Sequence, residues 1–142
     1  LTKMYKTYLF AHVIWAIQNK ETQMSKPIRV VLFSHLQKMA EEKGIKILQV
    51  NGGADHIHVL LQLHPAQNLA QVIRLLKAES ADWLNATHLL PEGFEWEEEY
   101  AAYSVSPSAV KQVTDYLDRQ EEYHKTKSLE AELEVFEKVQ NG

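Results

Sequence analysis

The sequence predicts an α+β domain: a ferredoxin-like, split βαβ sandwich with an antiparallel sheet and added C-terminal helices. Three observations support this class. Strand-like and helix-like segments follow one another in the order strand, helix, strand, strand, helix, strand, and then helices. The helix-like segments carry apolar residues at helical spacing, and the strand-like segments are rich in aromatic and branched residues. Between the second and third strands, Asn51-Gly52-Gly53 favours a tight turn and therefore an antiparallel hairpin.

Size and composition indicate a single globular domain over residues 1–142, in which about residues 126–142 form a helical extension. The content of 45% hydrophobic and 24% charged residues is typical of such a domain. The absence of cysteine excludes disulfides and thiolate metal sites. The first residues lack the apolar core of a signal peptide, and no run approaches the roughly 18 apolar residues of a membrane span. We expect a cytoplasmic protein without a membrane partner.

The formal net charge of -4 is unevenly distributed along the chain. Residues 1–50 hold eight Lys or Arg against three acidic residues, whereas residues 51–142 hold seven against sixteen. Phosphate binding depends on a local positive surface and not on the total charge. The charge pattern therefore permits a nucleic-acid partner without implying one.

The first strand and helix are predicted from alternation and capping signals. Residues 5–16 contain no Gly or Pro, and both faces of the strand are largely apolar, which is typical of a central strand. One face carries Ala11 and Val13, and the other carries His12 and Ile14. A helix then begins at Ser25-Lys26-Pro27, with serine as N-cap and proline in the first turn, and ends at Gly44.

The remaining elements follow the same signals. Residues 45–50 and 55–63 form the predicted hairpin, and Asn68 is the candidate N-cap of a second helix. Residues 96–105 are predicted to form a strand whose acidic start, residues 97–99, suits a solvated sheet edge. A third helix starts at Ser106-Pro107 and runs to about residue 123, and a last amphipathic helix covers residues 129–139. The buried stripe of the third helix is Val110, Val113 and Leu117.

The strongest chemical signal is the pair His56 and His58 at the start of the third strand. Side chains alternate across a strand, so the two imidazoles share one face, roughly 7 Å apart, while the other face is wholly apolar. Two nitrogen ligands could converge on one metal ion. The alternative is a pair of surface or hydrogen-bonded histidines, and a third ligand from elsewhere is needed to decide between them.

A second pair lies on the third helix, where Tyr116 and Gln120 are four residues apart and share a face beside the buried stripe. We expect the phenolic oxygen to be accessible, and the amide oxygen is a possible third metal ligand. A partly buried tyrosine next to a solvated glutamine is the simpler interpretation of this spacing.

Taken together, these segments resemble a known family. His56-Ile57-His58 resembles the HUH motif of histidine, bulky hydrophobic residue and histidine, and residues 116–120 resemble the tyrosine helix of single-tyrosine HUH transposases. These enzymes belong to small bacterial insertion sequences, of the insertion-sequence-200-like kind, that move as single-stranded DNA. Residues 12–15 and 96–106 resemble the family's first strand and the segment before its tyrosine helix. The resemblance extends to about residue 125.

The resemblance implies a DNA transposase that cleaves and rejoins single-stranded DNA at hairpin-bearing element ends. By this resemblance Tyr116 is the catalytic nucleophile and forms a 5′-phosphotyrosine, while His56, His58 and Gln120 hold a divalent ion, Mg2+ or Mn2+. Two imidazoles suit manganese better than magnesium. The family is homodimeric, and its tyrosine helix can serve the histidine pair of the partner subunit, so composite active sites are expected.

Two other functions compete with this one. A catalytically silent DNA-hairpin-binding protein derived from such a transposase would keep binding but form no covalent adduct. A metal hydrolase could also use the histidine pair, but barrel hydrolases with such a strand have chains of about 250 residues.

The remaining histidines are interpreted as structural or surface residues, and four cations are either phosphate contacts or solvated charges. These histidines are His12, His35, His64, His88 and His124, and the cations are Lys26, Arg29, Arg74 and Lys77.

Overall fold

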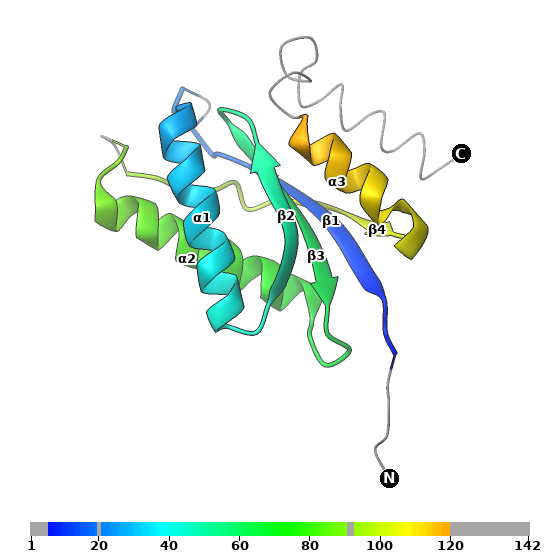
Figure 1. The fold of residues 1–142 in the computed structure, drawn as a ribbon. Helices are drawn as coiled ribbons and strands as arrows, with labels where there is room; N and C mark the ends of the chain where they lie inside the picture. The colour runs from blue at the N-terminus through cyan, green and yellow to red at the C-terminus, as the bar shows by residue number, and fades with distance from the viewer. Residues whose placement is uncertain (1–5, 20, 91–92, 120–142) are drawn as a thin grey trace.

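The computed structural model describes residues 6–19, 21–90 and 93–119 (Figure 1). Within them the strands and helices alternate as the sequence predicts. The elements, in chain order, are β1 (Leu9–Ala16), α1 (Lys26–Glu42), β2 (Lys46–Gly52), β3 (His56–Leu63), α2 (Leu69–Thr87), β4 (Ala101–Val105), the short 3-10 helix η1 (Pro107–Ala109) and α3 (Val110–Asp118). The last helix predicted over residues 129–139, and the predicted end of the third helix, lie outside the described residues.

The sheet has four strands in the order β2-β3-β1-β4, and every neighbouring pair is antiparallel. This order is the ferredoxin-like arrangement, so the predicted α+β fold class is confirmed. β1 lies between β3 and β4, as expected for a strand with two covered faces. β1 is therefore hydrogen-bonded on both edges, and its backbone is fixed from both sides.

The two faces of the sheet have different partners. Odd-numbered residues of β1 and β3, among them Val13, Trp15 and Val59, pack with α1 and α2 in the main hydrophobic core. Figure 1 shows α1 and α2 on one side of the sheet and α3 on the other. Leu60 and Leu117, both fully buried, lie on the α3 side. The two-residue alternation of β3 thus sends Ile57, Val59 and Leu61 into the core and its histidines toward α3.

The predicted strand over residues 96–105 is too long. Trp96 forms an isolated bridge with Ile17, and β4 begins only at Ala101, opposite Ile14. The four residues between Trp96 and Ala101 therefore stand opposite only two residues of β1. Trp96 is held on the core side, where its indole N–H donates to Ser80 Oγ at 2.9 Å. Because this hydrogen bond holds Trp96 in place, the segment between Trp96 and Ala101 contains more residues than a regular ladder with β1 would have.

The hairpin forms where predicted, but its glycines act differently from the prediction. Among the described glycines only Gly44 has a positive φ, 73°, just after α1. Gly52 is needed because of close approach: a Cβ there would lie 2.3 Å from the carbonyl oxygen of His56. No described helix is long and apolar enough to cross a membrane.

Candidate active site

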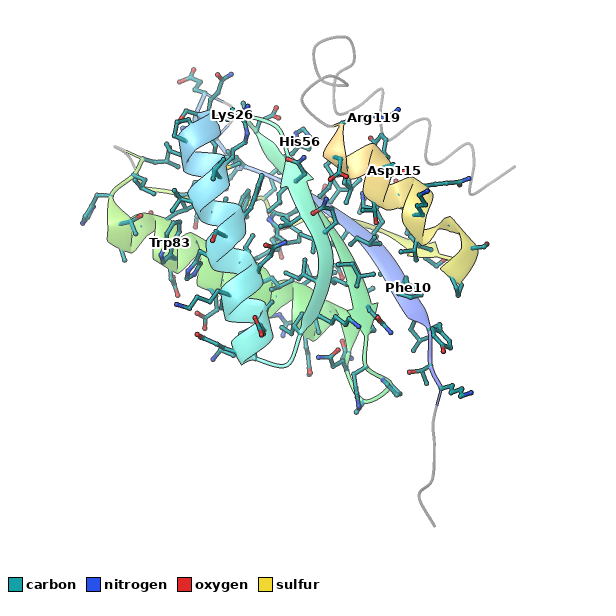
Figure 2. The ribbon with its side chains drawn as sticks, in the orientation of Figure 1. Phe10, Lys26, His56, Trp83, Asp115 and Arg119 are labelled. Carbon is teal, nitrogen blue, oxygen red and sulfur yellow. The ribbon has the colours of Figure 1, made fainter. Side chains whose placement is uncertain are left out.

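β3 places His56 and His58 on the face covered by α3. Their exposed fractions are 1% and 0%, and their ring centroids lie 5.0 Å apart at an interplanar angle of 74°. The Nε2 atoms of both rings are buried. Figure 2 shows His56 at the end of β3 that lies toward the C-terminal end of α3, where Arg119 is labelled. Because Ile57 and Val59 are fixed in the core, a flip of the strand that would turn these histidines toward α1 and α2 is excluded.

The Nδ1 atom of His56 is hydrogen-bonded to the neighbouring carboxylate. It lies 2.8 Å from Asp55 Oδ1, and the Asp55 side chain is 57% exposed. An ionised carboxylate has only acceptor atoms, so Nδ1 of His56 must donate and carry the proton. In neutral His56 the lone pair is then at Nε2. This is the arrangement that carboxylates impose on metal-binding histidines.

His58 has a different partner, His12 on β1. His12 Nε2 lies 2.8 Å from His58 Nδ1, and the two rings are stacked with centroids 5.1 Å apart. His12 is 1% exposed, and burial lowers its pKa from 6.5 to about 4. It is therefore neutral at pH 7. In the β1–β3 ladder His12 stands opposite Leu60, so His58 is its diagonal neighbour on the same face.

Tyr116 reaches these two histidines from α3. Its ring centroid lies 6.0 Å from that of His58 and 6.3 Å from that of His12, and its phenolic oxygen is buried. A second tyrosine, Tyr103 on β4, stands opposite His12 in the ladder with its ring 6.3 Å away. A β-sheet and a helix therefore bring two imidazoles and a phenol into one buried group within a single chain.

Polar contacts with β2 hold the C-terminal end of α3 over the sheet. Asn51 Nδ2 donates to the carbonyl oxygen of Leu117 at 2.7 Å, and Gln49 donates to Asp118 Oδ1. Asn51 stands opposite His58 in the β2–β3 ladder, so it projects from the same face. The contacts of Asn51 and Gln49 place the helix that bears Tyr116 directly over the histidine-bearing strands.

The other residues considered from the sequence lie away from the group of His58, His12 and Tyr116 or outside the residues that the structure describes. Gln120, the expected third ligand, lies outside the described residues. His64 is exposed and accepts from the backbone N–H of Ala66 in the turn after β3, so it does not extend the histidine face. His35 stacks on Trp83 between α1 and α2, with ring centroids 4.5 Å apart. His12, interpreted from sequence as structural or surface, is the site residue that sequence reasoning missed.

Two of the candidate phosphate contacts bind within the protein. Lys77 Nζ donates to the carbonyl oxygens of Glu97 and Glu98, and Arg29 Nη1 donates to the carbonyl oxygen of Met24 at 2.8 Å. These cations stabilise loops of the domain, so their presence in the sequence is no evidence for DNA contact.

The donor set fits a divalent ion in part. No group of three or more His, Cys, Asp or Glu side chains that could hold a metal occurs among residues 6–19, 21–90 and 93–119. The buried Nε2 atoms of His56 and His58 are suitable nitrogen donors, with the Nδ1 atom of each ring already engaged on the other side. Further donors from an amide, water or substrate oxygen would complete such a site.

Comparisons with known proteins agree on one family. The family model described as "Transposase IS200 like" matches residues 5–120. The chain is 24% identical over 121 residues to the ISDra2 transposase TnpA of Deinococcus radiodurans. This match covers 82% of this chain and 86% of the relative. It is also 30% identical over 70 residues to the transposase for insertion sequence element IS200 of Salmonella typhimurium. That match covers 49% of this chain and 46% of the relative.

Two solved structures share the fold. A crystal structure of a Deinococcus radiodurans protein described as a transposase has a TM-score of 0.66 at 24% identity, covering 84% of this chain and 96% of that chain. The structure of a REP-associated tyrosine transposase bound to a REP hairpin has a TM-score of 0.62 at 13% identity, covering 87% and 74%.

Proposed function

The chain belongs to the family of IS200-like transposases, and we propose that it cleaves and rejoins single-stranded DNA through a 5′-phosphotyrosine formed on Tyr116. The observation that carries this proposal is the position of Tyr116. Its phenol lies in the same buried group as His58 and His12, on a helix held against the sheet by Asn51. A tyrosine with only a packing role would not require imidazole neighbours.

The proposed chemistry exchanges one phosphodiester for another. Tyr116 Oη attacks the phosphorus of the scissile phosphate and loses its proton. The bond from phosphorus to the 3′ oxygen breaks, and that oxygen takes up a proton to leave as a 3′ hydroxyl. A 3′ hydroxyl of another strand then attacks the phosphotyrosine, restores the phosphodiester and returns the phenol. The covalent bond conserves the energy of the original linkage, so no nucleotide cofactor is needed.

A divalent ion, Mg2+ or Mn2+, is part of the proposal, with His56, His58 and Gln120 as its protein ligands. When bound, it would neutralise charge on the phosphate oxygens and stabilise the leaving oxygen. The residues themselves position the reactants. A tyrosine phenol has an ordinary pKa of about 10 and is neutral at pH 7, so Tyr116 needs activation by its surroundings.

The substrate and assembly are also proposed. We expect DNA ends with a hairpin as the substrate, since the REP-associated neighbour, which shares the fold, is bound to a REP hairpin. We also expect a homodimer. Within one chain the phenol already lies beside His58. A dimer of this protein would therefore use each tyrosine in its own subunit, or exchange the tyrosine helices between subunits.

The test is covalent adduct formation. The protein is incubated with Mn2+ and a labelled single strand that carries a hairpin and a candidate element end, and a band shift is measured on a denaturing gel. Tyr116→Phe should abolish the adduct, whereas Tyr103→Phe, the other tyrosine near His12, should form it. An adduct with Tyr116→Phe overturns the nucleophile assignment. Hairpin binding by the wild-type protein without any adduct indicates the silent hairpin-binding protein instead.

A further inference from the structure

The hydrogen bond between His12 and His58 has a direction that decides which nitrogen of His58 carries the lone pair. A neutral imidazole carries its proton on one nitrogen and a lone pair on the other. If His12 donates, His58 keeps its proton on Nε2 and has no lone pair there. If His58 donates from Nδ1, its lone pair is on Nε2, which is buried.

The neighbouring histidine indicates the second direction. His56 donates from Nδ1 to the carboxylate of Asp55, which leaves its own lone pair on Nε2. His56 and His58 come from the same face of one strand, and their Nε2 atoms are both buried. If His12 accepts, the two histidines adopt the same tautomer and can act together on one ligand.

We propose that His12 is a positioning residue for His58: its Nε2 accepts the Nδ1–H of His58, which makes Nε2 of His58 the metal-binding nitrogen. This inference rests on the proposed metal-dependent function. His12 here takes the part that Asp55 takes for His56, with an imidazole acceptor replacing the carboxylate. Acceptors of this kind set the orientation and tautomer of metal-binding histidines.

The location of His12 suits this role. Its side chain is 1% exposed and that of His58 is 0% exposed, so water does not compete for their hydrogen bond. His12 comes from the central strand, which is paired on one side with β3 and on the other with β4. Residues that orient a site work best when their own backbone is rigid.

The test begins with the metal-free full chain, in which ¹⁵N NMR of the histidine rings identifies the protonated nitrogen. In the wild-type protein we expect the proton of His58 on Nδ1. His12→Phe removes the acceptor and keeps a ring of similar size, so it should abolish this preference. His12→Gln offers an amide oxygen as a substitute acceptor and should restore the preference. His64→Gln, at an exposed histidine, is the matched control and should change nothing.

Mn2+ affinity, measured by calorimetry, is the second readout. His12→Phe should weaken binding about 10- to 100-fold, and His12→Gln should stay within a few-fold of wild type. The proposal is overturned if wild-type His58 carries its proton on Nε2. It is also overturned if His12→Phe binds Mn2+ as tightly as wild type, or if both variants lose binding equally, which would indicate a packing role. If wild-type protein binds no Mn2+, the metal part of the proposed function fails, and the His58 tautomer alone decides whether His12 is the acceptor.

Discussion

The ring of Tyr116 lies 6.0 Å from the ring of His58 in the same chain, at an interplanar angle of 76°. The two residues come from elements separated by α2, β4 and η1, and only the packing of α3 against the sheet brings them together. The arrangement within one chain means that a single subunit holds both the proposed nucleophile and the histidine pair. Substitutions at His56, Asn51 and Gly52 test this arrangement, and a substitution at His35 tests the contact between α1 and α2.

His56→Ala should abolish the covalent adduct and Mn2+ binding while hairpin binding stays within a few-fold of wild type. The reason is that His56 is buried at the site, whereas affinity for DNA comes mainly from phosphate contacts spread over the surface. Gel shift and adduct assays on the same preparation measure the two properties separately. His64→Ala, in the exposed turn after the same strand, is the control. Adduct formation at the wild-type rate would remove His56 from the proposed metal site.

Asn51→Ala should loosen the end of α3, because it removes the 2.7 Å hydrogen bond to the carbonyl oxygen of Leu117. We expect a loss of about 1 kcal/mol in the free energy of unfolding. The single-turnover rate of adduct formation should fall on the order of tenfold, since Tyr116 is less well positioned. Gln67→Ala removes a similar amide contact, to the carbonyl oxygen of Gly44, and should leave the rate unchanged. An unchanged rate in Asn51→Ala would show that this contact does not position Tyr116.

Gly52→Ala should disturb the histidine strand directly. The added Cβ would lie 2.3 Å from the carbonyl oxygen of His56 and 2.9 Å from Cα of Ile57, so backbone must move. We expect a loss of about 1–3 kcal/mol in unfolding free energy, measured by urea denaturation, together with weaker Mn2+ binding. Gly93→Ala, where no described atom lies within 4 Å of the new Cβ, should change neither property. Equal effects of the two substitutions would contradict the close-approach explanation.

His35 should make the stability of the protein pH-dependent. Burial lowers its pKa below the ordinary 6.5, an effect partly offset by Glu79 and Glu42. A lowered pKa means that the unfolded chain takes up the proton more readily than the folded chain. The stabilisation is therefore fully present above pH 6.5 and is lost as the pH falls below it, toward the pKa of the folded protein.

The comparison that checks this uses His35→Phe, which keeps a ring against Trp83 but cannot titrate. The unfolding free energy of wild type relative to His35→Phe should be constant above pH 7 and should fall between pH 7 and pH 5. A difference that does not change with pH would mean that His35 keeps its ordinary pKa in the folded protein.

Periodicity predicted most elements correctly because each depends on local chemistry. The N-cap at Asn68, whose side chain accepts from the N–H of Gln71, and the alternation of β3 are both written within a few neighbouring residues. The start of β4 was wrong because the indole of Trp96 binds Ser80 on another element. No local pattern in residues 96–105 contains that constraint.

The sequence alone determined the order of strands and helices along the chain, which indicates the fold class, the shared face of His56 and His58, and the presence of a tyrosine on a later helix. Two-residue and helical periods are local properties, so they can be deduced along the chain. Only the tertiary structure decided that Tyr116 meets His58 within one chain and that His12 joins them. Those contacts depend on strand register across β1 and β3 and on the docking of α3 by Asn51. Register and docking result from long-range packing, which no short stretch of sequence specifies.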